Sequence, residues 1–209
     1  MGSLAATANL RIAIPVFPGF EELDAIGPLE VFGLAAGSGL SISTTLVASD
    51  PGIPVLGIHG LTLTGLQPLD DDFDLIVVPG GAWLSGGPTG VRLAVAEGIL
   101  ARWLAARHAG GAVIAGVCTG VFLLHAAGLL DGKKATTHHL ALDHLRGLGV
   151  DVVEDRVVDA GDVLTAGGIA SGLDLALWIV EHQFGKSACR EVETMMEYCR
   201  QGRVARRAD

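Results

Sequence analysis

The chain is poor in cysteine and lacks the residue spacings that are typical of zinc sites. Its 209 residues include three cysteines, at positions 118, 189 and 199, and no CxxC pair. In a chain of this size that pattern excludes a disulfide framework and indicates a reducing compartment. An HxxxH pair is lacking as well, so we expect no metal and no other cofactor.

Basic residues and long hydrophobic runs are also scarce. Fourteen Lys and Arg against 23 Asp and Glu give a net charge of −9, whereas a nucleic-acid surface needs a basic face. The mean hydropathy is +0.49, yet polar residues or glycine interrupt every apolar run well before the roughly 20 residues of a membrane span. The first apolar run, 12–17, is too short for a signal peptide. We therefore expect a cytoplasmic protein that binds neither nucleic acid nor membrane.

Half of the positions are apolar, which is enough for one well-buried core in a chain of this length. No internal repeat, low-complexity linker or change in composition marks a second domain. We expect a single domain over residues 11–200, with flexible tails at 1–10 and 201–209.

Short β-branched runs alternate with amphipathic segments of helical length. Continuous apolar runs of this kind are typical of strands that are buried on both faces of a parallel sheet. The alternation predicts an α/β fold, a doubly wound three-layer sandwich with a mostly parallel central sheet. The expected strands are 11–17, 73–78 and 112–117, and the helices that follow them are 23–34, 90–108 and 121–130.

The remaining segments complete this outline. Residues 39–48 and 54–64 predict a further strand and a β-ribbon, with turns at Pro51-Gly52 and His59-Gly60. Residues 151–165 predict an antiparallel hairpin that turns at 159–162. Helices are expected at 171–184 and 187–198.

The stretch GVCTG, residues 116–120, follows a predicted buried strand and precedes an apolar helix. This is the context of a nucleophile elbow, in which flanking glycines allow a tight, strained turn. The N-terminus of the next helix is expected to lower the pKa of the Cys118 thiol and to cradle negative charge. The alternative is that Cys118 is a small apolar core residue.

Two further segments follow predicted strands, and strand carboxyl ends are where open α/β sheets bind ligands. Gly80-Gly81 permits close backbone approach to a ligand, although a loop with positive φ would need the same residues. The segment 17–24 places Glu21, Glu22 and Asp24 at the start of a helix, where acids are also common for dipole reasons alone.

The general base stays open at this stage. None of the seven histidines is next to Cys118 in the sequence. His138 and His139 are the leading candidates, and His125 is more typical of a packing residue. For each of them a role outside catalysis remains the alternative.

Taken together these motifs resemble the ThiJ/PfpI superfamily from about Arg11 to Tyr198. The resemblance implies a flavodoxin-like sandwich related to class I glutamine amidotransferases. It is carried by FPGFEELDAIGPLEVF (17–32), FDLIVVPGG (73–81), GVCTG (116–120), AAGLLDGKKATTHH (126–139) and LTAGGIASGLDLAL (164–177).

Within the superfamily, the first motif, the CTG of the elbow and KKATTHH are similar to the isocyanide hydratase branch. The resemblance implies a hydro-lyase that acts on a small uncharged molecule, with Cys118 as nucleophile and Asp24 as acid and base. Gly80, Gly81, Thr119 and Ile169 would then supply backbone groups and the pocket wall, with the loop 82–89 beside them. Superfamily members usually form two-fold dimers, so we also expect a homodimer, with helix 23–34 as a candidate face.

One departure bears on the reaction. Peptidase-like and glyoxalase-like members usually carry His directly after the nucleophile, and this chain has Thr119. That disfavours peptide hydrolysis, which needs a strong acid for the leaving amine. Two alternatives stay open: a glyoxalase III or deglycase activity on small dicarbonyls, and a redox or ligand sensor related to AraC-type regulators without their helix-turn-helix extension.

Overall fold

A computed structural model of the chain describes residues 9–69, 72–83 and 86–206. Its centre is a seven-stranded sheet in the order β11-β9-β10-β6-β5-β1-β2. The five strands from β10 to β2 run parallel to one another, and β9 pairs antiparallel with β10. The strands of this sheet are β1 (Leu10–Pro15), β2 (Ile42–Val47), β5 (Leu75–Val78), β6 (Val113–Val117), β9 (Val157–Asp159), β10 (Val163–Ala166) and β11 (Val204–Arg206).

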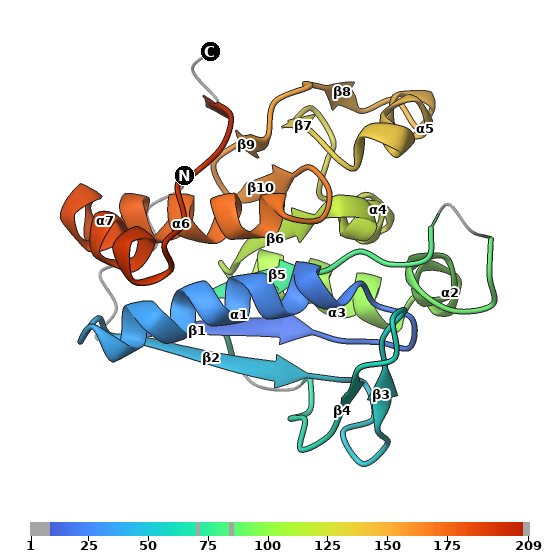
Figure 1. Ribbon diagram of the computed structural model, residues 1–209. Helices are drawn as coiled ribbons and strands as arrows, with labels where there is room; N and C mark the ends of the chain where they lie inside the picture. The colour runs from blue at the N-terminus through green and yellow to red at the C-terminus, as the bar shows by residue number, and fades with distance from the viewer. Residues whose placement is uncertain (1–8, 70–71, 84–85, 207–209) are drawn as a thin grey trace.

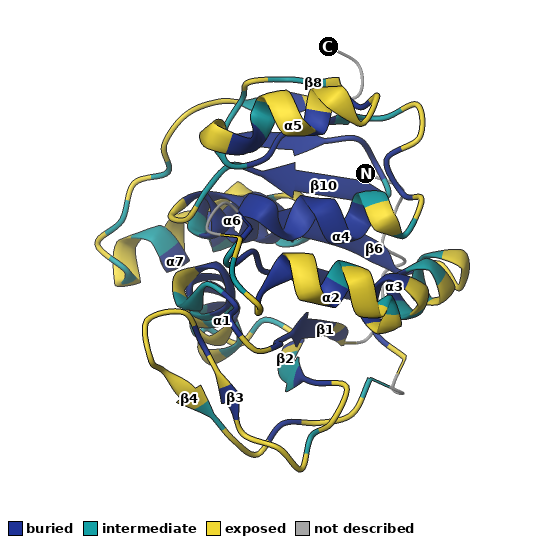
Figure 2. Ribbon diagram, turned by 90° about the vertical axis from the view of Figure 1, so that its right-hand side faces the viewer, coloured by how far each residue is buried: buried dark blue, intermediate teal, exposed yellow. Residues whose placement is uncertain are grey.

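The parallel order confirms the predicted α/β class. The central strands β5, β6 and β10 are buried along their whole length, as continuous β-branched runs predict. Figure 2 shows them dark blue between the helices. Among the described helices, none is both long and apolar enough to cross a bilayer.

Helices cover both faces of the sheet and form the outer layers of the sandwich (Figure 1). Helices α1, α6 and α7 contact one another on one face, and α2, α3 and α4 do so on the other. Helix α5 lies beyond the sheet, beside β8. The bounds are α1 (Glu22–Gly37), α2 (Val91–Glu97), α3 (Ile99–Ala109), α4 (Val121–Ala126), α5 (Leu142–Gly147), α6 (Ser171–Phe184) and α7 (Lys186–Met195).

Several expected elements differ in extent. The predicted helix 90–108 is divided into α2 and α3 because Gly98 takes φ +68°, a left-handed conformation that ends α2. The helix expected at 121–130 ends as α4 at Ala126. The hairpin expected at 151–165 is confirmed only for β9 and β10, since β8 (Asp151–Val152) pairs instead with β7 (Lys134–Ala135).

The chain ends also differ from the expectation of flexible tails. Leu10 begins β1, and residues 204–206 form β11, which pairs along β9 and so completes the sheet edge. Residues 1–8 and 207–209 lie outside the described residues. The expected β-ribbon at 54–64 is confirmed as β3 (Val55–Leu56) and β4 (Thr62–Leu63), an antiparallel pair separate from the main sheet.

This topology brings distant segments to one edge. The segments that follow β1, β5, β6 and β10 all lie at the carboxyl edge of the parallel strands. They carry Asp24, Gly80, Cys118 and Ile169, so the sheet collects the residues that the sequence singled out.

Candidate active site

Cys118 sits in a strained conformation at the end of β6. Its φ is +54°, in the left-handed region that a residue with a Cβ rarely adopts. The backbone on both sides holds it there: the Cys118 N–H donates to the carbonyl of Gly167 at 3.0 Å, and its carbonyl accepts from Thr137 Oγ1 at 2.6 Å. The side chain is 6% exposed. This is the turn that the elbow motif predicts.

Gly116 and Gly120, the two glycines of the elbow, are needed for close packing, and neither has a positive φ. A Cβ on Gly120 would lie 2.4 Å from the carbonyl oxygen of Val78 and 2.6 Å from that of Pro79. A Cβ on Gly116 would be tightly placed against Val121, at 3.1 Å. The elbow thus packs directly onto the end of β5, and the positive φ falls on the cysteine itself.

Gly80 and Gly81 lie next to the elbow, and both must be glycine because neighbouring atoms approach them closely. A Cβ on Gly80 would lie 2.7 Å from the Thr119 nitrogen and 2.9 Å from Asp24 Oδ2. Gly81 has φ +141°, and a Cβ there would lie 2.2 Å from the carbonyl of Gly19. The Gly80 N–H, which was expected to face a ligand, instead donates to Asp24, and Gly80 is not among the described residues that line the cavity, whereas Gly81 is.

Asp24 lies in the first turn of α1 and is completely buried, with 0% exposure. Its Oδ2 accepts the Gly80 N–H at 2.9 Å. The other oxygen, Oδ1, is buried and accepts no hydrogen bond of normal geometry, although the carboxyl and the Cys118 thiol are close enough to alter each other's pKa. Burial raises the pKa of Asp24 well above its ordinary value, and the Gly80 N–H only partly opposes this.

The expectation of a lowered thiol pKa is wrong. Burial raises the pKa of Cys118, and the charge of Asp24 raises it further. A short 3-10 turn, Cys118–Gly120, precedes the six-residue α4, so no long helix points its N-terminus at the sulfur. Cys118 and Asp24 therefore compete for a proton in a low-dielectric site, and the pair resists carrying two negative charges.

Thr119 opposes this shift with two donors. Its backbone N–H and its hydroxyl lie close enough to the Cys118 sulfur to lower the pKa of the thiol. The same hydroxyl accepts the Gly81 N–H at 3.1 Å. The Gly81 N–H, expected to face a ligand, thus reaches the sulfur only through Thr119.

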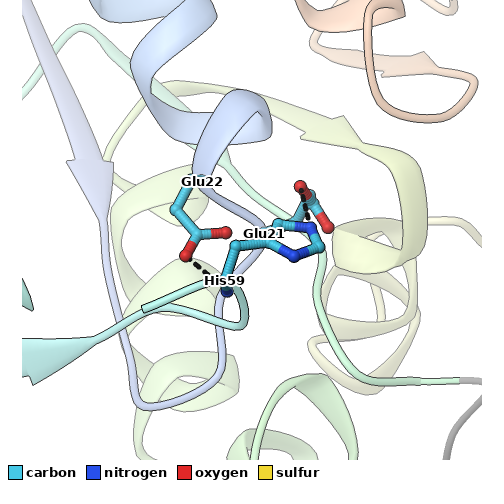
Figure 3. A group of neighbouring side chains, drawn as sticks. All are labelled: Glu21, Glu22 and His59. Carbon is cyan, nitrogen blue, oxygen red and sulfur yellow. Dashed lines mark hydrogen bonds and ion pairs between the residues drawn. The ribbon is translucent and has the colours of Figure 1, made fainter. Parts of the chain in front are cut away.

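Glu21 and Glu22 contact the ribbon formed by β3 and β4 (Figure 3). Glu22 Oε1 accepts the backbone N–H groups of His59 at 2.6 Å and Leu61 at 3.4 Å, which ties the ribbon to α1. Glu21 Oε1 lies 3.4 Å from His59 Nε2. Burial raises the pKa of Glu21, while the nearby His59 lowers it.

These three side chains form the single group of described residues whose ligand atoms, all within 4.8 Å, could hold an ion. Sequence spacing could not reveal this group, because His59 lies 37 residues from Glu22 in the chain and only the β3–β4 ribbon brings it to α1.

The histidines that were candidates for a general base occupy different positions. His138 lines the cavity, and its Nδ1 accepts the Leu140 N–H at 3.2 Å, so a neutral ring carries its proton on Nε2. Burial lowers the pKa of His138, as does the adjacent His139. His139 is exposed and stacks on His138, and His125 is half-buried on α4 outside the cavity lining.

A cavity of about 210 Å³ opens above the thiol. It is smaller than the roughly 300 to 1,000 Å³ of sites for drug-sized ligands. A larger hollow of about 510 Å³ lies at the opposite edge of the sheet and contains none of the predicted site residues. The cavity above the thiol is lined by Glu21, Ile58, Gly81, Ala82, Trp83, Cys118, Thr119, His138 and Ile169.

Trp83 and Ile58 belong to this lining and were not named from the sequence. The loop 82–89 had been expected to supply a wall, and Trp83 is the large side chain within its described part. A tryptophan two residues after Gly81, in the segment that follows a strand, was the available signal. Ile58 gave none, because it comes from the ribbon.

Comparison with known proteins now adds to the geometry. The model of the DJ-1/PfpI family matches residues 10–182. The chain belongs to the DJ-1/PfpI family. It is 36% identical over 191 residues to the isonitrile hydratase of Pseudomonas putida, which covers 90% of this chain and 78% of that protein.

A solved ThiJ/PfpI family protein from Pseudomonas syringae superposes with a TM-score of 0.82 at 30% identity, over 93% of this chain and 77% of that one. A glutathione-independent glyoxalase of Caenorhabditis elegans, DJR-1.2, is 29% identical over 109 residues, covering 52% of this chain and 54% of that protein. The DJ-1/PfpI family therefore includes enzymes of more than one activity on this fold.

Proposed function

We propose that the protein hydrates a small isocyanide, R–NC, to the formamide R–NH–CHO, with Cys118 as nucleophile and Asp24 as acid and base. The observation that carries the proposal is the buried Cys118 thiol in the lining of a small cavity, with the fully buried Asp24 carboxyl close enough to influence the thiol. An isocyanide suits this pair because its terminal carbon accepts both a nucleophile and a proton. Similarity to an isonitrile hydratase supports the same reaction.

The first step adds the thiol across the isocyanide carbon. The sulfur forms the S–C bond as the thiol proton passes to Asp24, and Asp24 delivers that proton to the same carbon. The product is the thioimidate R–N=CH–S–Cys118, with Asp24 again a carboxylate. A free thiolate need not accumulate, so the raised pKa of Cys118 is compatible with attack.

The second step hydrolyses the thioimidate. Asp24 takes a proton from water as the water oxygen bonds to the carbon, and the nitrogen is protonated by Asp24 in turn. The tetrahedral carbon then expels the sulfur, and the hydroxyl proton returns to Cys118 through Asp24. The sum is R–NC plus H₂O giving R–NH–CHO, and no redox partner is consumed.

Thr119 is the hydrogen-bond donor best placed to stabilise negative charge on the Cys118 sulfur during both steps. Its N–H and hydroxyl already contact the thiol, and they favour the leaving thiolate when the tetrahedral carbon collapses. The Gly81 N–H holds the hydroxyl in place. Thr119 thus supplies stabilisation without the acid that amide hydrolysis needs.

The two alternatives make different demands. A glyoxalase uses a thiol and a carboxylate as well, but the apolar side chains of Ile58, Trp83 and Ile169 suit polar dicarbonyls less well. A peroxide sensor needs a thiolate, and burial of Cys118 with a raised pKa disfavours one.

The test is incubation of the purified protein with cyclohexyl isocyanide, with formamide followed by chromatography. We expect turnover by the native chain and none by Cys118→Ala. Methylglyoxal and hydrogen peroxide serve as parallel arms. Absence of formamide from the native chain overturns the hydratase assignment, and loss of methylglyoxal or specific oxidation of Cys118 would support the glyoxalase or the sensor instead.

We further propose a homodimer, with the start of α1 in its interface. Leu23 on α1 and Ile53 and Leu56 near the ribbon are exposed apolar side chains, which are costly to leave in water. Sedimentation equilibrium should give twice the 21.5 kDa chain mass. A monomer at micromolar concentration would contradict this.

A further inference from the structure

The cavity above Cys118 has an uneven charge. Glu21 is the one carboxylate among its described lining residues, and no Lys or Arg is among them. Its side chain is only 12% exposed. The backbone fixes its position, because the Glu21 N–H donates to the Gly80 carbonyl at 2.8 Å. Glu21 therefore places a negative charge in the lining of the cavity that Cys118 also lines.

His138 does not balance this charge. Burial lowers its pKa, so the ring is neutral at neutral pH, and its Nδ1 is already engaged by the Leu140 N–H. Its Nε2–H is then a neutral hydrogen-bond donor. His59 does pair with Glu21, but its side chain is 70% exposed and lies outside the cavity lining.

The opposite wall is a fixed apolar surface. The Trp83 indole stacks on Phe122 with 4.0 Å between ring centroids, and its Nε1 donates to His144 Nδ1 at 3.2 Å. The Arg92 guanidinium lies 4.5 Å from the indole centroid, and its Nε donates to the Trp83 carbonyl at 2.6 Å. Contacts on this many sides make Trp83 a rigid wall against which a substituent packs.

We propose that Glu21 is a specificity-determining residue that makes the site reject anionic substrates, so that the isocyanide carries a neutral, mainly apolar substituent packed against Trp83. This inference rests on the proposed hydratase function for its substrate, but the charge selection itself is a property of the cavity. Glu21 acts by repulsion across the cavity and takes no part in the chemical steps.

The size of the cavity makes the repulsion effective. A substituent held within a space of about 210 Å³ that Glu21 lines would lie largely within the roughly 8 Å over which physiological salt screens charges. An added carboxylate would also lose its hydration without a cation to pair with. We expect discrimination of at least about tenfold between a neutral compound and its anionic analogue.

The first experiment uses turnover of a matched pair, methyl isocyanoacetate and isocyanoacetate, which differ by an ester and a carboxylate. We expect kcat/KM at least about tenfold higher for the ester in the native chain. In Glu21→Gln the ratio of the two kcat/KM values should fall by about threefold or more, because the KM for isocyanoacetate becomes lower. Glu30→Gln is the matched control, because Glu30 is exposed on α1 and outside the cavity lining, and its ratio of kcat/KM values should equal that of the native chain.

The second experiment needs no turnover. Iodoacetamide and iodoacetate alkylate thiols and differ in charge, and mass spectrometry separates modification at Cys118 from that at the exposed Cys199. We expect the iodoacetamide to iodoacetate rate ratio at Cys118 to fall about threefold or more in Glu21→Gln, with the ratio at Cys199 unchanged.

The outcomes separate the two proposals. A Cys118 ratio that is the same in Glu21→Gln and the native chain overturns charge selection. Failure of every isocyanide to turn over, together with the expected Cys118 ratios, overturns the hydratase function and leaves charge selection supported.

Discussion

The floor and the mouth of the cavity are built in different ways. The floor, formed by Cys118, Thr119 and Asp24, is buried and held by backbone contacts at strand ends. The mouth, formed by Glu21, Ile58 and Trp83, is assembled from side chains on α1, the β3–β4 ribbon and the loop after β5. Chemistry thus depends on geometry that tolerates little change, whereas selection depends on contacts that substitution can alter one at a time.

This contrast sets the expected size of each effect. A change in the floor removes a reacting group or forces backbone apart, and the low-dielectric surroundings enlarge the result. A change at the mouth alters packing or a half-exposed charge, which water and salt partly compensate. Substitutions in the two regions therefore test whether the division is real.

Asp24→Asn should have the largest effect on activity. It keeps the shape of the side chain and removes the proton carrier, so we expect kcat to fall by about 10² to 10⁴-fold with formamide production as the measurement. Glu30→Gln removes an exposed charge farther along α1 and should leave kcat within about twofold. A native-like rate in Asp24→Asn would mean that the floor does not contain the acid and base.

The same variant should also change how stability depends on pH. Because the folded protein raises the pKa of Asp24 above its ordinary value of 3.8, folding favours the protonated form. The stabilisation is complete below that value and is lost as pH rises through the folded pKa. Urea unfolding should therefore show the native chain losing stability relative to Asp24→Asn as pH increases from 3.8, and a constant difference would contradict the assignment.

Gly120→Ala should destabilise the floor without touching a reacting group. The added methyl would meet the carbonyl oxygens of Val78 and Pro79, so we expect a loss of about 2 kcal/mol in the free energy of unfolding. Gly33→Ala on α1 is the matched control, because nothing lies within 4 Å of its added Cβ. That control should gain up to about 1 kcal/mol from helix propensity. Equal urea midpoints for the two variants would show that Gly120 does not pack closely against the end of β5.

Thr119→Val should weaken catalysis by a smaller factor. The change keeps the volume but removes the hydroxyl that lowers the pKa of the Cys118 thiol and accepts the Gly81 N–H. We expect kcat to fall by about 10- to 100-fold and the pKa of Cys118 to rise, measured by the pH dependence of iodoacetamide alkylation. Thr119→Ser keeps the hydroxyl and should restore most of both. Recovery that fails in Thr119→Ser would assign the effect to packing.

The floor could be predicted from the sequence because its information is local. A buried strand, GVCTG and a following helix fix the position of Cys118, and strand ends collect Gly80 and Asp24 at one edge whatever the loops do. The direction of the thiol pKa could not be predicted, since it depends on how deeply Cys118 is buried and on the three-dimensional placement of Asp24. Strand β11 was also missed, because three residues in a basic tail gain their pairing only from β9.

The mouth could not be predicted for a different reason. Ile58 reaches the cavity and His59 reaches Glu21 because Glu22 binds the backbone of the ribbon, a contact between segments 37 residues apart. Nothing in the local pattern of 54–64 distinguishes a ribbon that folds over α1 from one that extends into water. Position in a loop therefore told little about which side chains would meet a substrate.

Of these substitutions, His59→Ala should have the smallest effect, and it gives the most direct test of the difference between floor and mouth. It removes a mostly exposed partner of Glu21, so we expect stability to change by less than about 1 kcal/mol and kcat/KM for cyclohexyl isocyanide by less than about twofold. Since His59 lowers the pKa of Glu21, that pKa should rise in the variant. The iodoacetamide to iodoacetate preference at Cys118 should then weaken at a higher pH during acidification than in the native chain. A large loss of kcat in His59→Ala would instead place the ribbon in the chemistry and remove the distinction between floor and mouth.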